Sequence, residues 1–197
     1  RGLGDVYKRQ IMDSNGFIFD TSKICFCDLE TYSPHSLPSV GSYRYAEDSE
    51  ILLIAWGFID GAVYWQDIAN GGRLPVPKDL PPDTIMCSNN VMFDRTILAA
   101  HNSPLALLPW VDAMVISLCH SMPGKLEDMG KALGLPEEKL KDKRGNRLID
   151  MFCKPRPKNQ ILRRLTAQTH PEDWNDFIRY LIQDVVTLIE CFKLLPK

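Results

Sequence analysis

The stretch that decides the fold is Ile24-Cys25-Phe26-Cys27-Asp28-Leu29-Glu30, a short and largely apolar run bounded by polar residues. Such a run is typical of a strand that is buried on both faces of a sheet. Because side chains alternate along a strand, Asp28 and Glu30 leave the same face near its C-terminal end. A D-x-E pair is common on protein surfaces, but at the end of a buried strand its charge needs compensation. The pattern therefore predicts a cation site at a sheet edge.

Further runs predict a mixed sheet around this strand. Two β-rich runs are separated by Asp60-Gly61, a strong hairpin signal, and a proline-rich loop over 74–82 follows them. The predicted strands are 24–30, 51–59, 62–65, 84–88 and 110–112. Together with the helices, they predict one α/β domain in which helices flank the sheet.

Helical patterns occupy much of the remaining sequence. The predicted helices are 94–101, 113–121, 125–133 and about 171–195. Gly134 ends the third of these as a C-cap glycine, and Thr169 with Glu172 predicts a capping box for the fourth. Apolar residues recur with a helical period along the fourth helix, so one of its faces is predicted to be buried.

Three more residues join the carboxylate pair as candidates. Asp94 begins a helix directly after a predicted strand, where an acid could also simply favour the helix dipole. Tyr180 and Asp184 are four residues apart on the long helix and therefore share one of its faces. Asp184 interrupts the apolar stripe of that helix, so its ionised form needs a cation, strong hydrogen bonds or access to water.

Length and composition set the broad class. The chain has 197 residues, 45% of them hydrophobic, which fits a single globular domain with its own core. Ten basic and two acidic residues lie between Lys139 and Arg164, so this segment carries +8 within a chain of net charge −2. The segment is either a surface that contacts phosphates or a solvated face.

Other features argue for a soluble protein of the cytoplasm. The sequence has no apolar run long enough to span a bilayer and no signal-peptide pattern. Its six cysteines lie mostly among apolar residues without a C-x-x-C pair, which favours reduced, buried thiols over zinc ligands. We exclude residues 1–10 from the fold as a non-native N-terminal extension.

In order and type, these residues resemble the motifs of the DEDD 3'-5' exonuclease superfamily, namely D-x-E, N-x-x-x-D and Y-x-x-x-D. Tyr180 indicates the tyrosine subtype, because position 179, where the histidine subtype has His, is Arg179. Residues 126–135 and 154–174, together with Asp112, resemble the proofreading domain of phage-type family A DNA polymerases. The resemblance covers residues 23–197, although Asn89 stands where related sequences often have His.

The resemblance implies a ribonuclease H-like fold that binds two divalent cations, Mg²⁺ or Mn²⁺, and releases nucleoside monophosphates from single-stranded or frayed DNA 3' ends. It implies Asp28, Glu30, Asp94 and Asp184 as metal ligands and Tyr180 as the residue that orients the attacking water. Leu29, Thr31, Asn90 and Phe93 would contact the substrate, and a polymerase domain would belong to the same full-length chain. Four carboxylates also suit Mg²⁺ on chemical grounds.

Two alternatives remain open at this point. One is an RNA-trimming exonuclease of the ribonuclease D type, and the other is a nucleic-acid-binding module that has lost catalysis. For the exonuclease interpretation, Phe93 and Tyr32 are candidate stacking platforms for bases.

Overall fold

The computed structural model describes residues 10–12, 18–140, 145–157 and 159–196. Of the predicted N-terminal extension, residues 1–9 lie outside this range, and Gln10 begins a short hairpin of β1 (Gln10–Met12) and β2 (Ile18–Asp20). Residues 141–144 and Lys158 of the basic segment also lie outside the described range.

Within the described residues, a sheet of five strands has the order β5-β4-β3-β6-β7. Its strands are β3 (Ile24–Tyr32), β4 (Glu50–Phe58), β5 (Val63–Asp67), β6 (Ile85–Ser88) and β7 (Trp110–Asp112). The strands β3, β4 and β5 pair antiparallel, whereas β6 and β7 join parallel to β3. The predicted α/β fold with a mixed sheet is therefore confirmed, and all five predicted strands are present.

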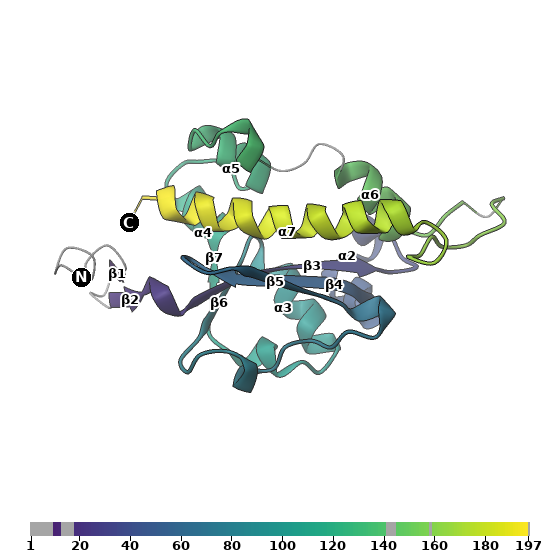
Figure 1. Cartoon of the computed structure of the whole chain (residues 1–197), viewed down its shortest axis with the longest axis horizontal. Helices are drawn as coiled ribbons and strands as arrows, with labels where there is room; N and C mark the ends of the chain where they lie inside the picture. The colour runs from purple at the N-terminus through teal and green to yellow at the C-terminus, as the bar shows by residue number, and fades with distance from the viewer. Residues whose placement is uncertain (1–9, 13–17, 141–144, 158, 197) are drawn as a thin grey trace.

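Helices cover both faces of this sheet (Figure 1). The α-helices are α2 (Leu37–Glu47), α3 (Val91–Ala100), α4 (Ala113–Cys119), α5 (Leu126–Ala132), α6 (Gly145–Phe152) and α7 (Pro171–Leu194). Short 3₁₀ turns are η1 (Thr21–Lys23), η2 (Ile68–Asn70), η3 (Pro77–Asp79), η4 (Pro104–Leu107) and η5 (Glu137–Lys139). None of the described helices is long and apolar enough to cross a membrane.

Alternation along β3 divides the core into two clusters. Ile24 and Phe26 face α7, and Phe26 meets Phe192 of that helix edge to face at 5.0 Å. Cys25 and Cys27 face the opposite cluster, which includes residues of α2 and α3. The same alternation directs Asp28 and Glu30 to the α7 side of the sheet.

The predicted helix ends lie within two residues of the observed ends except at the start of α3, which begins at Val91 and not at Asp94. Gly134 has a φ of +74° after α5, as expected of a C-cap glycine. The capping box at Thr169 is wrong, because His170 is the N-cap of α7 and no side chain caps it. The Thr169 hydroxyl instead donates to the backbone carbonyl of Thr166. Helices α2 and α6 were not predicted.

Candidate active site

Three of the four predicted acids meet between β3 and α7. Asp28, Glu30 and Asp184 each present an oxygen atom, and these atoms lie within 4.8 Å of one another. Glu30 and Asp184 are 7% and 3% exposed, so the group combines close approach with burial. Three carboxylates held this close repel one another unless protons or cations intervene, and hard oxygen donors suit Mg²⁺ or Mn²⁺.

The fold brings these acids together through regular structure. Asp28 and Glu30 lie opposite Ala55 and Leu53 of β4, and a bulge follows at Glu30/Thr31. Asp184 reaches them from α7, which packs across both strands. Rigid strands and a long helix therefore hold the site, and no flexible loop supplies an acid.

Tyr180 lies one turn before Asp184 and is almost completely buried, at 1% exposure. Burial, together with the charges of Asp184, Glu30 and Asp28, raises the pKa of its phenol well above the usual range. The hydroxyl therefore stays protonated and can donate a hydrogen bond at the acid cluster. Its ring stacks on Phe177 with an interplanar angle of 5°.

Helix α6 packs against the Tyr180 ring at Gly145. A Cβ atom at Gly145 would lie only 2.0 Å from Cε2 of Tyr180, so any larger residue would displace the ring or the helix. An ion pair between Arg147 and Asp173, 2.7 Å long, ties α6 to α7. At the end of α6, the thiol of Cys153 donates to Oε2 of Glu30 at 3.4 Å. The approach of Gly145 to Tyr180 and the hydrogen bond from Cys153 to Glu30 were not predicted from the sequence.

Asp94 is placed differently from the other acids. It is buried in the first turn of α3, on the opposite side of the sheet, and does not belong to the group of three. Burial raises its pKa to about 7, while the Ser88 hydroxyl lowers it and the charge of Asp112 raises it further. Asp94 therefore remains a predicted ligand that lies outside the group of three acids.

Asp112 organises the turn that carries Asp94. Its carboxylate accepts hydrogen bonds from the backbone amides of Asn90 and Val91 before α3, at 3.1 and 2.9 Å. It also accepts from Met114 and Val115 at the start of α4. Asn90, which is predicted to contact substrate, is the N-cap of α3 and occupies the left-handed region at φ +80°. It lines a different groove from the other predicted substrate contacts, together with Met92 and Arg95.

We expect Asp112→Ala to destabilise the protein by about 2–4 kcal/mol, because four backbone amides lose their common acceptor. Urea unfolding followed by circular dichroism measures this change. Asp112→Asn keeps one oxygen that can accept hydrogen bonds, so its free energy of unfolding should lie between those of the wild type and Asp112→Ala. A loss of less than about 0.5 kcal/mol for Asp112→Ala would show that these hydrogen bonds do not hold the turn.

A cavity of about 550 Å³ opens beside Glu30. It is lined by Leu29, Glu30, Thr31, His35, Ser36, Leu37, Pro38, Tyr45, Phe93, Ile149, Cys153, Lys154 and Pro155. Three of the four predicted substrate contacts, namely Leu29, Thr31 and Phe93, are thus together here. The Tyr45 and Thr31 hydroxyls are hydrogen bonded at 3.0 Å, which fixes the inner wall. The lining is mostly apolar with a few polar groups, as in pockets that take a small organic group.

Tyr32 is less suited to stacking with a base than its sequence position suggested. The guanidinium of Arg164 covers one face of its ring, 4.1 Å from the centroid. Phe93 is therefore the better placed of the two predicted platforms.

All six cysteines are free thiols, five of them buried, as predicted, and Cys119 is exposed.

An α/β sheet with an acid cluster on one strand and a facing helix defines a candidate metal-dependent enzyme site. No protein-family model matches this chain. The chain is 38% identical over 168 residues to the DNA polymerase of Bacillus phage SP02. The match covers 80% of this chain but 26% of the phage protein, so the chain corresponds to about a quarter of that relative's length. The chain is thus related to a region of a phage DNA polymerase.

Proposed function

We propose that this chain is a 3'-5' exonuclease domain of the tyrosine subtype, which proofreads DNA for a family A polymerase. The observation that carries the proposal is the cluster of Asp28, Glu30 and Asp184 within 4.8 Å, with Tyr180 buried against it. The relationship to a phage DNA polymerase supports DNA over RNA as the substrate. The unit responsible would be residues 23–197.

The residues present fit divalent cations. Three buried or half-buried carboxylates converge, and their repulsion is relieved by binding positive charge. Asp28, Glu30 and Asp184 would hold the ions, with Asp94 completing the set. Bound Mg²⁺ or Mn²⁺ would activate a water molecule and stabilise the charge that develops on the phosphate and the leaving oxygen.

The protein's own groups would position the reactants. The protonated hydroxyl of Tyr180 can donate a hydrogen bond to the attacking water, and Glu30 can accept one from it. The cavity beside Glu30 is large enough for a terminal nucleoside, whose base would lie against Phe93. Because these contacts are apolar and not base-specific, we expect any 3'-terminal nucleotide to be accepted once its strand is frayed.

The test is degradation of 3'-end-labelled single-stranded DNA with Mg²⁺ or Mn²⁺, beside an RNA strand of the same sequence. We expect rapid release of labelled deoxynucleoside monophosphate, complete inhibition by excess EDTA, and much slower loss of the RNA label. Equal or faster loss from RNA would favour a ribonuclease D-like activity. No release from either strand with either metal would point to an inactive binding module.

For Tyr180→Phe we expect turnover to fall about 10-fold, because one hydrogen bond to the attacking water is lost. The Mg²⁺ concentration that gives half-maximal activity should not change, since the tyrosine is not a ligand. Single-turnover rates measured over a Mg²⁺ series separate these two quantities. Tyr64→Phe, at an exposed position on β5, is the matched control. An unchanged rate for Tyr180→Phe would remove the hydroxyl from the mechanism.

A further inference from the structure

Residues 154–157 and 159–168 belong to a loop between α6 and α7 that projects beyond the end of the sheet (Figure 1). The backbone amide of Arg156 donates to the carbonyl of Arg163 at 3.2 Å, which closes the base of the projection. The guanidinium of Arg156 also donates to Oε1 of Gln160, at 3.2 Å. The projection is therefore a closed turn with its own hydrogen bonds, and Pro155 and Pro157 restrict its backbone.

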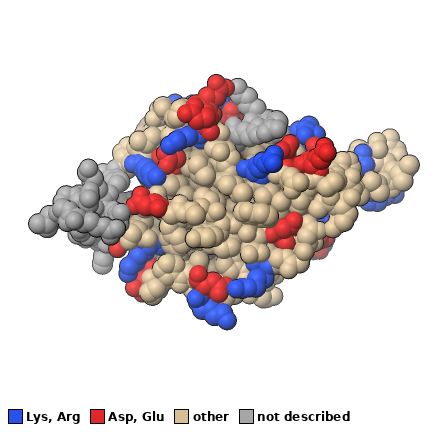
Figure 2. Space-filling model, viewed as in Figure 1, with Lys and Arg blue, Asp and Glu red and all other residues tan. Residues whose placement is uncertain are grey.

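The loop carries positive charge without acids. No Asp or Glu occurs between Asp150 and Glu172, whereas five Lys or Arg residues do, in a chain whose net charge is −2. In Figure 2, the end of the molecule that projects to the right carries blue side chains and no red ones. Two of these five residues pair with acids outside the loop, Lys154 with Asp150 and Arg164 with Glu50. The remaining positive charge attracts polyanions even though the whole chain is slightly acidic.

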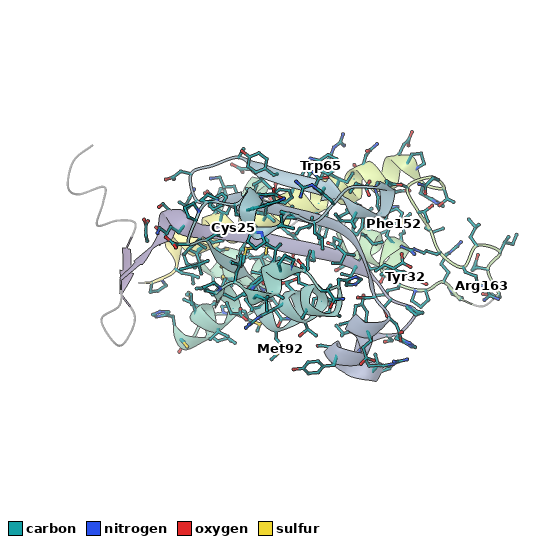
Figure 3. The ribbon with its side chains drawn as sticks, turned by 90° about the horizontal axis from the view of Figure 1, so that it is seen from below. Cys25, Tyr32, Trp65, Met92, Phe152 and Arg163 are labelled. Atoms are coloured by element: carbon teal, nitrogen blue, oxygen red, sulfur yellow. The ribbon has the colours of Figure 1, made fainter. Side chains whose placement is uncertain are left out.

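Both ends of the loop are fixed next to the candidate active site. Lys154 and Pro155 line the cavity beside Glu30. At the other end, Arg164 pairs with Glu50 at 2.7 Å and covers the ring of Tyr32, two residues after Glu30 on β3. In Figure 3, Arg163 lies at the outer end of the molecule, with Tyr32 and Phe152 further in. The projection thus continues outward from the cavity.

The tip of the loop is apolar. Ile161 is 99% exposed and Leu162 is 42% exposed, between the arginines of the loop. One exposed isoleucine is ordinary on a protein surface. Here, however, the exposed Ile161 lies next to basic residues and in line with a nucleotide-sized cavity. This combination suits single-stranded DNA, because its phosphates pair with cations and its bases offer flat apolar faces.

We propose that this loop binds the DNA strand that leads to the 3' end, with Arg156 and Arg163 on its phosphates and Ile161 against a base. The proposal rests on the proposed exonuclease function. Ile161 is two residues from Arg163 of the closing pair, so the loop reaches at most about 7 Å beyond that pair on this side. With a rise of about 3.4 Å per nucleotide in one strand, this reach corresponds to about two nucleotides.

The experiment compares two substrates that differ only in whether they reach the loop. One is a single-stranded DNA of about 20 nucleotides, and the other is the p-nitrophenyl ester of thymidine 5'-monophosphate, which fills the cavity alone. The variants are R156Q/R163Q and I161S in the whole 197-residue chain. The control is K193Q, which removes one exposed positive charge at the far end of α7.

For R156Q/R163Q we expect the KM for the long strand to rise about 10-fold at physiological salt, with kcat little changed. The slope of log KM against log salt concentration should fall by about 1.4, or roughly 0.7 for each lost phosphate contact. I161S should raise KM about 3-fold without changing that slope. Hydrolysis of the nitrophenyl ester should be the same in all variants, and K193Q should match the wild type on both substrates.

Two results would overturn the loop proposal while leaving the exonuclease proposal intact. One is a wild-type KM and salt slope for the long strand in R156Q/R163Q. The other is an equal loss on both substrates, which would mean that the substitutions disturb the site itself. Failure of the wild-type chain to hydrolyse either substrate would instead refute the proposed function and, with it, the loop proposal.

Discussion

Replacing Asp184 with Asn is expected to lower exonuclease turnover at least about 1000-fold, because one of the three converging carboxylates proposed to bind the cations loses its charge. The fold should survive, since Asn has nearly the same shape and the repulsion among Asp28, Glu30 and residue 184 is reduced. Thermal unfolding in EDTA should show a stability equal to or above that of the wild type.

Asp176→Asn is the matched control for this variant. It makes the same chemical change on the same helix, at an acid that pairs with Arg179 at 3.2 Å and lies outside the acid cluster. Turnover should stay within about twofold of the wild type for this control. Residual activity of more than about a tenth in Asp184→Asn would mean that the three-acid cluster is not the catalytic centre.

The second large effect concerns Asp94 and stability. Its pKa is about 7 in the folded protein, against an unfolded value near 3.8, because burial disfavours its charged form. Between these values the folded state binds more protons than the unfolded state, so this group reduces stability as pH rises from about 4 to 7. A shift of about 3 units corresponds to at most about 4 kcal/mol.

Asp94→Asn should therefore stabilise the metal-free protein by about 2–4 kcal/mol at pH 8, with the gain shrinking as the pH falls towards 4. Urea unfolding in EDTA across this pH range measures the difference. Asp128→Asn, at a half-exposed acid on α5, is the control and should show no such dependence. A variant less stable than the wild type at pH 8 would show that the Asp94 carboxylate is already compensated without metal.

The same substitution should also abolish most of the exonuclease activity if Asp94 serves as the fourth ligand. Stability and activity would then change in opposite directions at one residue. This is the expected behaviour of a site that keeps a buried charge for function at a cost in folding free energy.

The sequence predicted the central strand, the hairpin and the long helix because each has a clear period or turn signal. The proximity of Asp28 and Asp184 was predicted only from the order of the exonuclease-like motifs. The hydrophobic period of a helix does not indicate which strand that helix covers. The position of Asp94 on the other face of the sheet follows from the crossover after β6. That crossover depends on tertiary packing, which the sequence pattern does not contain.

Helices α2 and α6 were missed for physical reasons. In α2, Pro38 and Gly41 interrupt the pattern, and Gly41 has non-helical angles at φ +74°. Helix α6 has only eight residues and begins with Gly145-Asn146, which is typical of a loop. The contacts with Tyr180 and Glu30 come from Gly145 at the start of α6 and from Cys153 directly after it, and both depend on partners distant in the sequence.

Stepwise shortening of a 5'-labelled DNA strand tests the central claim most directly. One gel shows the direction of degradation, the number of nucleotides removed in each step and the dependence on metal. With Mg²⁺ the wild-type chain should produce a ladder that shrinks by single nucleotides from the 3' end. EDTA or Asp28→Ala should abolish this ladder. A ladder that persists in Asp28→Ala, or internal fragments in place of stepwise loss, would contradict the assignment of this acid cluster to 3'-5' exonuclease chemistry.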